Sequence, residues 1–193
     1  MTEQGQEARQ RMVAGAADMI RRRGLNATSV RELTKHSAAP LGSTYHYFPG
    51  GKQELAAEAV RYAGSLVSKV LRRELAAGPV EGLRAFLALW RQTVLGTDFQ
   101  AGCPVLAVAI EEPPAGDRSA VAAAAEVFAD WEALMGAALG ERGVAAPDAA
   151  RLATLVVAAV EGSVALCRAK RDIAPLDAVA TQLEAVLSAA VAR

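Results

Sequence analysis

Cysteine and histidine are scarce in this sequence, which limits the kinds of site that it can build. The 193 residues include two cysteines, Cys103 and Cys167, and two histidines. The cysteines lie far apart, and no pair of cysteines or histidines has the spacing of metal ligands. A structural disulfide and a zinc site are therefore not expected. We predict two buried thiols and a protein that uses no metal and no other cofactor.

Aromatic residues and strand patterns are also rare. Phe, Trp and Tyr make up 5% of the chain, and β-branched residues do not alternate with polar ones over any run. The hydrophobic share of 52% is instead rich in Ala, Val and Leu, which favours helices. A chain of this length can bury a sizeable core without disulfides. The sequence therefore predicts an all-α fold.

An apolar targeting segment is missing from the N-terminus. The first twelve residues, MTEQGQEARQRM, are polar and charged, and no later segment reaches the length of a membrane span without interruption. We expect a soluble, cytoplasmic protein.

Net charge is absent as well, but the charges are unevenly distributed. Residues 1–52 carry eight Lys or Arg against four Asp or Glu, and the rest of the chain carries thirteen against seventeen. A basic N-terminal part on a mildly acidic body suits a head that binds a polyanion, although this signal is weak by itself.

The side-chain combinations of an enzyme are not found. Both histidines, His36 and His46, lie near the N-terminus, no nucleophile is paired with a base, and no glycine-rich phosphate loop occurs. We therefore expect a protein that is not an enzyme.

The most informative stretch is residues 37–52, SAAPLGSTYHYFPGGK. Pro40 suits the first turn of a helix, and Pro49 with two glycines ends it. Helical spacing places Leu41, Thr44, Tyr45 and Phe48 on one side, and Gly42, Ser43, His46 and Tyr47 on the other. A helix this short must be held by its neighbours, while its small, polar side faces outward. That pattern is typical of a helix that reads a DNA groove.

Two further helices are predicted before this stretch. Apolar residues at helical spacing indicate a helix over residues 5–23, which ends in three arginines followed by Gly24. We interpret Arg21, Arg22 and Arg23 as residues that stabilise the helix end rather than as phosphate contacts. Either Thr28 or Ser29 caps a second, short helix. Together the three helices form a helix-turn-helix head.

This part of the chain resembles a known family of DNA-binding proteins. The run GLNATSVRELTKHSAAPLGSTYHYFPGGKQEL resembles the head of the TetR family of transcriptional repressors, and the similarity covers residues 8–60. The pairing of ATSVREL with YHYF and a following Lys carries the resemblance. The Pro-Gly-Gly-Lys ending and the later Gly102-Cys103-Pro104 resemble the LmrA/YxaF-like branch.

The resemblance implies a set of DNA contacts. It places Thr28 and Arg31 at the start of the supporting helix, Gly42, Ser43 and His46 toward bases, and Tyr45, Tyr47 and Lys52 on phosphates. Helical spacing agrees for most of these but puts Tyr45 at the protein edge, with only its hydroxyl within reach of a phosphate. Arg31 remains open between a phosphate contact and a solvated side chain, and His36 is expected to be structural.

One residue of the reading helix departs from the pattern. Leu41 stands where many relatives have a Lys, so the head is expected to lose a charged contact there. Lys52, at the start of the next helix, is a poor partner for the helix dipole, and a phosphate partner would explain its position.

The rest of the chain is expected to form a helical body. We predict domains at residues 1–52 and 53–193, with a helix over residues 52–75 that bridges them. Further helices are indicated by the apolar stripe from Leu83 to Val94, by residues 103–110 and by residues 121–139. Glu111 begins an acidic, proline-rich stretch that we expect to be a mobile surface loop.

The resemblance also implies a cavity for an apolar ligand in this body. The candidate lining residues are Tyr62, Trp90, Cys103, Phe128 and Trp131. Taken singly, an aromatic residue at helical spacing is more often a plain core residue, and it is the group of them that suggests a cavity. Glu161, in apolar surroundings, either senses the polarity of a ligand or bonds to a neighbouring helix.

The end of the chain indicates self-association. Residues 152–160, LATLVVAAV, are apolar on nearly all sides, so such a helix must be covered on both faces. The last helix offers a matching stripe from Leu176 to Leu187. The resemblance implies that the last two long helices form a symmetric four-helix dimer interface, and the alternative is that both fill the core of a monomer.

These observations lead to one expected function and one alternative. We expect a ligand-responsive repressor that binds a pseudo-palindromic DNA operator as a homodimer and is released by a small apolar effector. The alternative is a small-molecule binding protein of the same fold that does not bind DNA.

Overall fold

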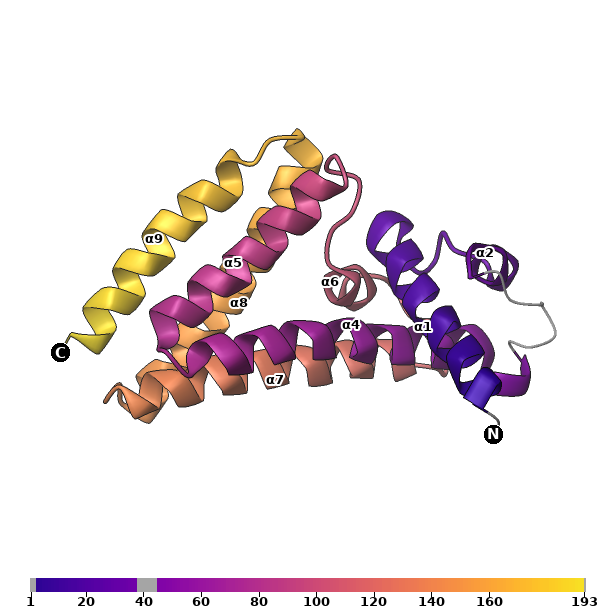
Figure 1. Cartoon of the computed structure of the whole chain (residues 1–193), viewed down its shortest axis with the longest axis horizontal. Helices are drawn as coiled ribbons and strands as arrows, with labels where there is room; N and C mark the ends of the chain where they lie inside the picture. Colours follow the sequence, from indigo (N-terminus) through magenta and orange to yellow (C-terminus); the bar gives the residue numbers. More distant parts are fainter. Residues whose placement is uncertain (1–2, 38–44, 193) are drawn as a thin grey trace. The chain divides into compact units, whose positions relative to one another are not determined.

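The structure is a computed structural model that describes residues 3–37 and 45–192 (Figure 1). Within these ranges it is helical and contains no strand, which confirms the predicted fold class. The helices are α1 (Glu3–Arg23), α2 (Val30–His36), α4 (Gly51–Leu75), α5 (Pro79–Gly96), α6 (Pro104–Ala109), α7 (Ser119–Glu141), α8 (Ala146–Lys170) and α9 (Ala174–Val191).

The chain divides into two compact units. The first comprises Met1–Gly64 with Cys103–Val127, and the second comprises Ser65–Gly102 with Phe128–Arg193. The first unit is therefore larger than the head that was expected at residues 1–52, because it also contains α6 and parts of α4 and α7. Both α4 and α7 contribute residues to each unit.

In the first unit, α1 packs against α2 and α6. The buried face of α1 includes Met12, Ala16 and Ile20, as its apolar spacing predicted, and Leu33 is buried on α2. Gly64 of α4 lies so close to α7 that an added Cβ atom would be 2.5 Å from Cγ1 of Val127. A glycine at this position lets the two helices approach each other.

The turn between α1 and α2 shows which residue caps the second helix. Ser29 is the N-cap: its Oγ accepts from the backbone N–H of Glu32 at 3.2 Å, and the Glu32 carboxylate accepts from the Ser29 N–H at 2.9 Å. This reciprocal pair is a capping box. Thr28 is buried instead, with 1% of its surface exposed, and its hydroxyl donates to the Gly24 carbonyl at 2.7 Å.

The arginines at the end of α1 bind a carboxylate within the head. Arg21 Nε donates to Asp18 Oδ1 at 2.8 Å, and Arg22 Nε donates to Asp18 Oδ2 at 3.2 Å. His36 of α2 lies 3.2 Å from the same carboxylate. Burial alone would raise the pKa of Asp18, but the bonds from Arg21 and Arg22 outweigh it and hold the pKa below its ordinary value. Arg21, Arg22 and His36 thus contact one carboxylate within the head, and the expectation that the arginines do not contact phosphates stays a prediction.

The second unit is built on α5, α8 and α9, which pack against one another. The predicted stripe of α5 is buried in full, and it consists of Leu83, Phe86, Leu87, Trp90 and Val94. In the same unit, Ser68 and Arg72 of α4 both donate to Asp130 of α7, at 2.6 and 2.8 Å. On α4, Val67 and Leu71 are buried, whereas Leu66 lies off their stripe and is exposed.

Helix α8 is continuous through Glu161 and Gly162. It is also apolar enough, with a mean hydropathy of 1.7 over 18 residues, to meet the length and composition of a membrane span. The expectation that no segment reaches this length was therefore wrong. The core helix of a soluble protein passes the same test, and 44% of this window is buried.

We expect the Asp18→Asn substitution to lower the free energy of unfolding by about 1 kcal/mol at neutral pH, because two charge-assisted bonds are lost. Since the pKa of folded Asp18 is depressed, its contribution is present above the unfolded pKa and is lost as the pH falls through the folded pKa. The difference between wild type and variant should be constant from about pH 7 to about pH 5 and should close below about pH 4.

Urea unfolding, followed by circular dichroism across this range, measures the difference. Asp148→Asn is the control, because it removes an exposed pair with Arg151 and should have a much smaller effect. A difference that does not shrink as the pH falls below about 4 would contradict the role assigned to the Asp18 carboxylate.

Candidate nucleic-acid interface

The described part of the reading stretch is held in place by Phe48. Residues 45–47 are helical, and the chain leaves the helix at Phe48, whose side chain is fully buried. The guanidinium of Arg9 lies over the Phe48 ring, 4.9 Å from its centre, and Arg9 also pairs with Glu58 of α4. Phe48 is thus the anchor that helical spacing predicted. Pro40, Leu41, Gly42, Ser43 and Thr44 lie outside the described residues.

Three ring side chains follow one another in this segment. His46 is exposed and Tyr47 is half-buried, and their rings meet edge to face with centres 5.0 Å apart. Tyr45 is 60% exposed, so its predicted place at the protein edge was wrong. Its ring passes near Gly51, where an added Cβ would be 3.8 Å from Tyr45 Cε1. Ring side chains that can form hydrogen bonds are therefore exposed here.

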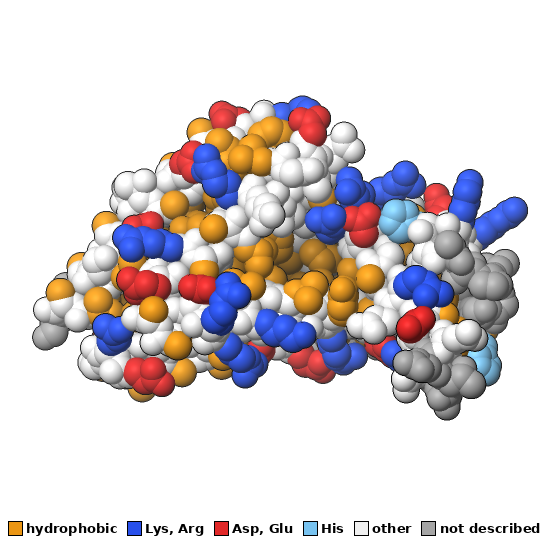
Figure 2. All heavy atoms as spheres, viewed as in Figure 1, with side chains coloured by type: hydrophobic (Ala, Val, Ile, Leu, Met, Phe, Trp, Pro, Cys, Tyr) orange, Lys and Arg blue, Asp and Glu red, His pale blue; other side chains and the backbone are white. Residues whose placement is uncertain are grey.

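Helix α2 adds positive charge to the same unit. Arg31 is exposed, as is Lys35 one turn later, and neither forms an ion pair with another described residue. On the face of the molecule in Figure 2, Lys and Arg side chains project from the surface over α1 and α2. Lys35 was missed in the sequence, although its spacing of four residues from Arg31 places both on one side of a helix. Thr28, in contrast, is buried.

Lys52, the second residue of α4, is partly buried beside two carboxylates. Burial lowers the pKa of Lys52, and the negative charges of Glu111 and Glu32 act in the opposite direction. Its contact with a phosphate stays a prediction.

Glu111 is a residue of the first unit whose position the sequence did not reveal. Its carboxylate accepts hydrogen bonds from the backbone N–H groups of Leu25 and Asn26, at 2.9 and 2.7 Å. The loop that it begins is thus attached to the α1–α2 turn at this residue, whereas a mobile surface loop was expected. No local pattern in the sequence could have revealed this contact, because Leu25 and Glu111 are 86 positions apart.

The candidate ligand residues of the second unit form an aromatic cluster. The ring of Phe86 lies 6.2 Å from that of Trp90 and 5.6 Å from that of Trp131, and Phe128 lies 5.6 Å from Trp131. Trp90 is 3% exposed, and its Nε1 has no hydrogen-bond partner among the described residues. A buried donor of this kind costs free energy unless something binds it. Glu161 is also buried in this unit.

Tyr62 and Cys103 belong to the first unit instead. Cys103 is buried at the start of α6, where its sulfur accepts from the Leu106 N–H at 3.5 Å, and Tyr62 is half-buried on α4. Both cysteines are buried thiols, as predicted. Among the described residues, no group of three or more His, Cys, Asp and Glu side chains is placed to hold a metal ion.

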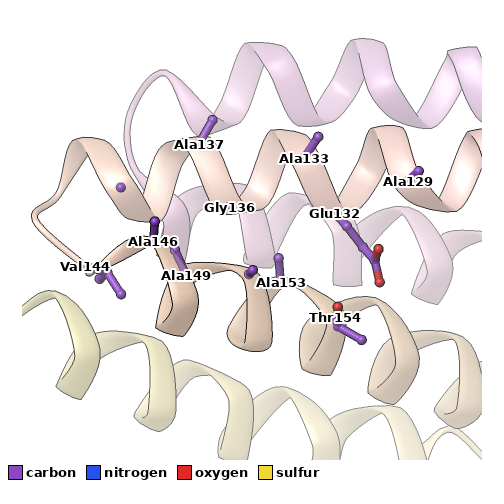
Figure 3. Close-up of a pocket in the computed structure, with 12 residues that line it drawn as sticks. Ala129, Glu132, Ala133, Gly136, Ala137, Val144, Ala146, Ala149, Ala153 and Thr154 are labelled. Atoms are coloured by element: carbon purple, nitrogen blue, oxygen red, sulfur yellow. The ribbon is translucent and has the colours of Figure 1, made fainter.

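A groove of about 650 Å³ runs between α7 and α8 in the second unit (Figure 3). Its walls consist mostly of small residues, among them Ala133, Gly136, Ala149 and Ala153. Glu132 of α7 and Thr154 of α8 point toward each other across it (Figure 3). None of the predicted ligand residues lines this groove.

Family models match both parts of the chain. Residues 13–59 match the model described as bacterial regulatory proteins, tetR family, and residues 79–182 match the C-terminal domain of LmrA/YxaF-like transcriptional regulators. The second match alone covers more than half of the 193 residues.

Named relatives align with this chain over nearly their whole length. The chain is 43% identical, over 95% of its length and 96% of the relative's, to an uncharacterized HTH-type transcriptional regulator of Mycobacterium tuberculosis. It is 32% identical, with the same coverage, to the uncharacterized HTH-type transcriptional regulator YxaF of Bacillus subtilis. The HTH-type transcriptional regulator LmrA of the same organism is 28% identical over 88% of this chain and 91% of its own.

Solved structures show the same fold. A TetR transcriptional regulator from Chloroflexus aurantiacus is 28% identical, covers 97% of each chain and has a TM-score of 0.75. The regulatory protein TetR from Rhodobacter sphaeroides, at 20% identity, covers 92% of this chain and 97% of its own with a TM-score of 0.81. The chain thus belongs to the TetR family of bacterial regulatory proteins, in its LmrA/YxaF-like branch, and is a transcriptional regulator with a helix-turn-helix head.

Proposed function

We propose that the protein is a ligand-responsive transcriptional repressor, which binds a pseudo-palindromic operator as a homodimer and is released by a small apolar effector. The observation that carries this proposal is the division of basic residues in the first unit. Arg21 and Arg22 are bound to Asp18, whereas Arg31 and Lys35 are exposed and form no ion pair with a described residue. Uncommitted basic side chains beside exposed hydrogen-bonding rings suit phosphate and base contacts.

Each proposed DNA contact has a role in this scheme. Gly42, Ser43 and His46 face base edges, and Arg31, Tyr45, Tyr47 and Lys52 contact phosphates. Thr28, which is buried, supports the α1–α2 turn rather than touching DNA. In a two-fold dimer the reading helices enter successive major grooves about 34–36 Å apart. Such a regulator works where the DNA is, so we propose that it is cytoplasmic.

The dimer is supported by an uncovered face of α8. Between Arg151 and Lys170, every exposed residue of this helix is uncharged, and Leu155 and Leu166 are 46% and 49% exposed. On α9, Val186 is 39% exposed. Large apolar side chains that share a helix face with small ones are typical of an interface.

A second copy of the chain is the partner that this face suits best. Gly162 lies on it, and an added Cβ there would meet no atom within 4 Å, so the helix offers room for close approach. An isologous contact would bury α8 and α9 of each protomer against those of the other. The resulting four-helix contact would cover the side of α8 that the protomer leaves open.

The effector site is proposed at the aromatic cluster of the second unit. Trp90, Phe128 and Trp131 supply apolar surface there, and Glu161 is a polar group of the same unit. Tyr62 and Cys103 belong to the proposed site only if the effector also contacts the first unit. The unpartnered Nε1 of Trp90 suits an effector that is apolar overall but carries one hydrogen-bond acceptor. An effector that binds the DNA-incompetent state more tightly lowers operator affinity.

We expect Tyr47→Ala and Lys52→Ala to weaken binding to all DNA sequences, because both residues are assigned to phosphates. Lys52→Ala should also lower the slope of log affinity against log salt by about 1. The probe is a duplex selected by the wild-type protein from a random-sequence library and titrated between about 50 and 200 mM salt by fluorescence anisotropy. Lys69→Ala, an exposed lysine elsewhere on α4, is the control and should change nothing. A wild-type protein that selects no duplex would favour the alternative of a binding protein without DNA.

For the dimer, we expect Gly162→Arg to produce monomers at micromolar concentration. An unpaired charge buried at an interface costs several kcal/mol, which weakens association by about a hundredfold or more. Gly140→Arg makes the same change at a site on α7 that is also open within the protomer, and it should leave the dimer intact. Sedimentation velocity distinguishes the two variants. A Gly162→Arg variant that sediments as a dimer would rule out the α8 face.

For the effector, we expect Trp90→Phe to weaken ligand binding by about tenfold, because the indole N–H is lost while most of the ring remains. Compounds that raise the melting temperature of the wild type are identified first, in a thermal-shift screen of lipophilic molecules with one acceptor group. Trp131→Phe is the control, since it removes a similar volume from the same cluster. Equal losses in both variants would mean that the Trp90 N–H does not bind the ligand.

A further inference from the structure

The α1–α2 turn is held by a segment that lies outside the helix-turn-helix. Glu111 Oε1 accepts from the Leu25 N–H at 2.9 Å, and Oε2 accepts from the Asn26 N–H at 2.7 Å. The Asn26 side chain donates in turn to the carbonyl of Glu112, at 3.3 Å. Both glutamates lie in the loop between α6 and α7, and this loop belongs to the same compact unit as the head.

These bonds satisfy groups that the turn itself leaves open. Helix α1 ends at Arg23, and within the described residues no backbone carbonyl accepts the N–H of Leu25 or Asn26. Leu25 is buried, so an open N–H there would carry a desolvation cost. A carboxylate that accepts two N–H groups forms charge-assisted bonds, which are stronger than neutral ones.

Gly24 makes the approach of the carboxylate possible. Its φ of +82° is a conformation that residues with a side chain rarely adopt, and an added Cβ would collide with Glu111 Oε1. The glycine is therefore required both by the turn and by the carboxylate beside it.

The same carboxylate lies close to the starts of two helices. Thr28 binds Gly24 through its hydroxyl, so the turn is continuous with the capping box that begins α2. The charge of Glu111 also acts on Lys52, at the start of α4. Glu111 is thus placed to affect Arg31 through α2 and to affect Lys52 directly, and both are proposed phosphate contacts.

The junction is closed rather than open to a ligand. The free space between the α1–α2 turn and the loop is about 10 Å³, enough for no more than one water molecule. This volume is too small for an effector. The role of the Glu111 contact must therefore lie in its effect on the α1–α2 turn.

We propose that Glu111 is a positioning residue for DNA binding: its carboxylate holds the α1–α2 turn in the arrangement that presents α2 and Lys52 to the phosphates. The inference rests on the proposed repressor function. It adds that operator affinity depends on a residue of the α6–α7 loop, which itself does not touch DNA.

The test compares Glu111→Gln with Glu112→Gln. The first variant keeps the size of the side chain but turns one acceptor oxygen into an NH₂ donor that faces a backbone N–H. The second makes the same charge change one residue later, on an exposed side chain, and keeps the carbonyl that accepts from Asn26. Affinity is measured with a duplex that the wild-type protein selects from a random-sequence library.

We expect Glu111→Gln to bind this duplex about tenfold more weakly or worse, and Glu112→Gln to stay within about twofold of wild type. Amide hydrogen exchange, measured by NMR, should be faster at Leu25 and Asn26 in Glu111→Gln and unchanged in α8 and α9. Glu111→Asp, which keeps the charge and both acceptors, should recover part of the affinity.

The outcomes separate the inference from the function on which it rests. If the wild type binds the duplex and the two Gln variants bind it equally well, Glu111 has no positioning role, although the repressor proposal stands. If Glu111→Gln also loses protection in α8 and α9 and Glu111→Asp recovers no affinity, the residue supports the whole fold rather than the DNA-binding turn, and the inference is wrong. A wild type that selects no duplex overturns both.

Discussion

The head of this regulator depends on a constraint of helix length. Helices shorter than about 12–15 residues are marginal in water, and α2 has seven residues. The helical turn at residues 45–47 is equally dependent on its surroundings, and it gains its anchor from Phe48, which is buried under Arg9. Because stability comes from such anchors, the outward sides of these helices are free to carry hydrogen-bonding groups. Because Phe48 anchors this segment, Tyr45 and His46 can remain exposed.

Carboxylates decide which cations of the head are available to DNA. Asp18 binds Arg21 and Arg22, and Glu32 lies 3.6 Å from Arg23 while it completes the cap of α2. An excess of positive charge over residues 1–52 does not reveal this division, since it counts bound and unbound arginines alike. Arg31 and Lys35 of α2, in contrast, form no ion pair with a described residue. Unpaired cations at defined positions on one helix can match phosphates more selectively than an undivided basic patch.

Local periodicity predicted those features that depend on neighbours in the sequence. The buried stripe of α5, the anchor Phe48 and the all-α fold follow from spacing and composition alone. The exposure of Tyr45 did not follow from spacing, although Tyr45 is helical and shares its predicted side with Phe48. The place of Glu111 is set by a contact across 86 residues, and that is a property of the tertiary fold. For the same reason the compact units, which group α6 with the head, do not coincide with the boundary drawn at residue 52.

Two helices restrict how the second unit can affect the first. Both α4 and α7 cross the division as unbroken helices, so a displacement of either must continue along it or be absorbed by bending. Lys52 is the second residue of α4, and α7 follows the loop that begins with Glu111. A shift of α4 would therefore act on a proposed phosphate contact, whereas a shift of α7 would act on the carboxylate that holds the α1–α2 turn. The head is in this way connected to both helices through residues that are charged, and the Lys52 and Glu111 charges attract each other.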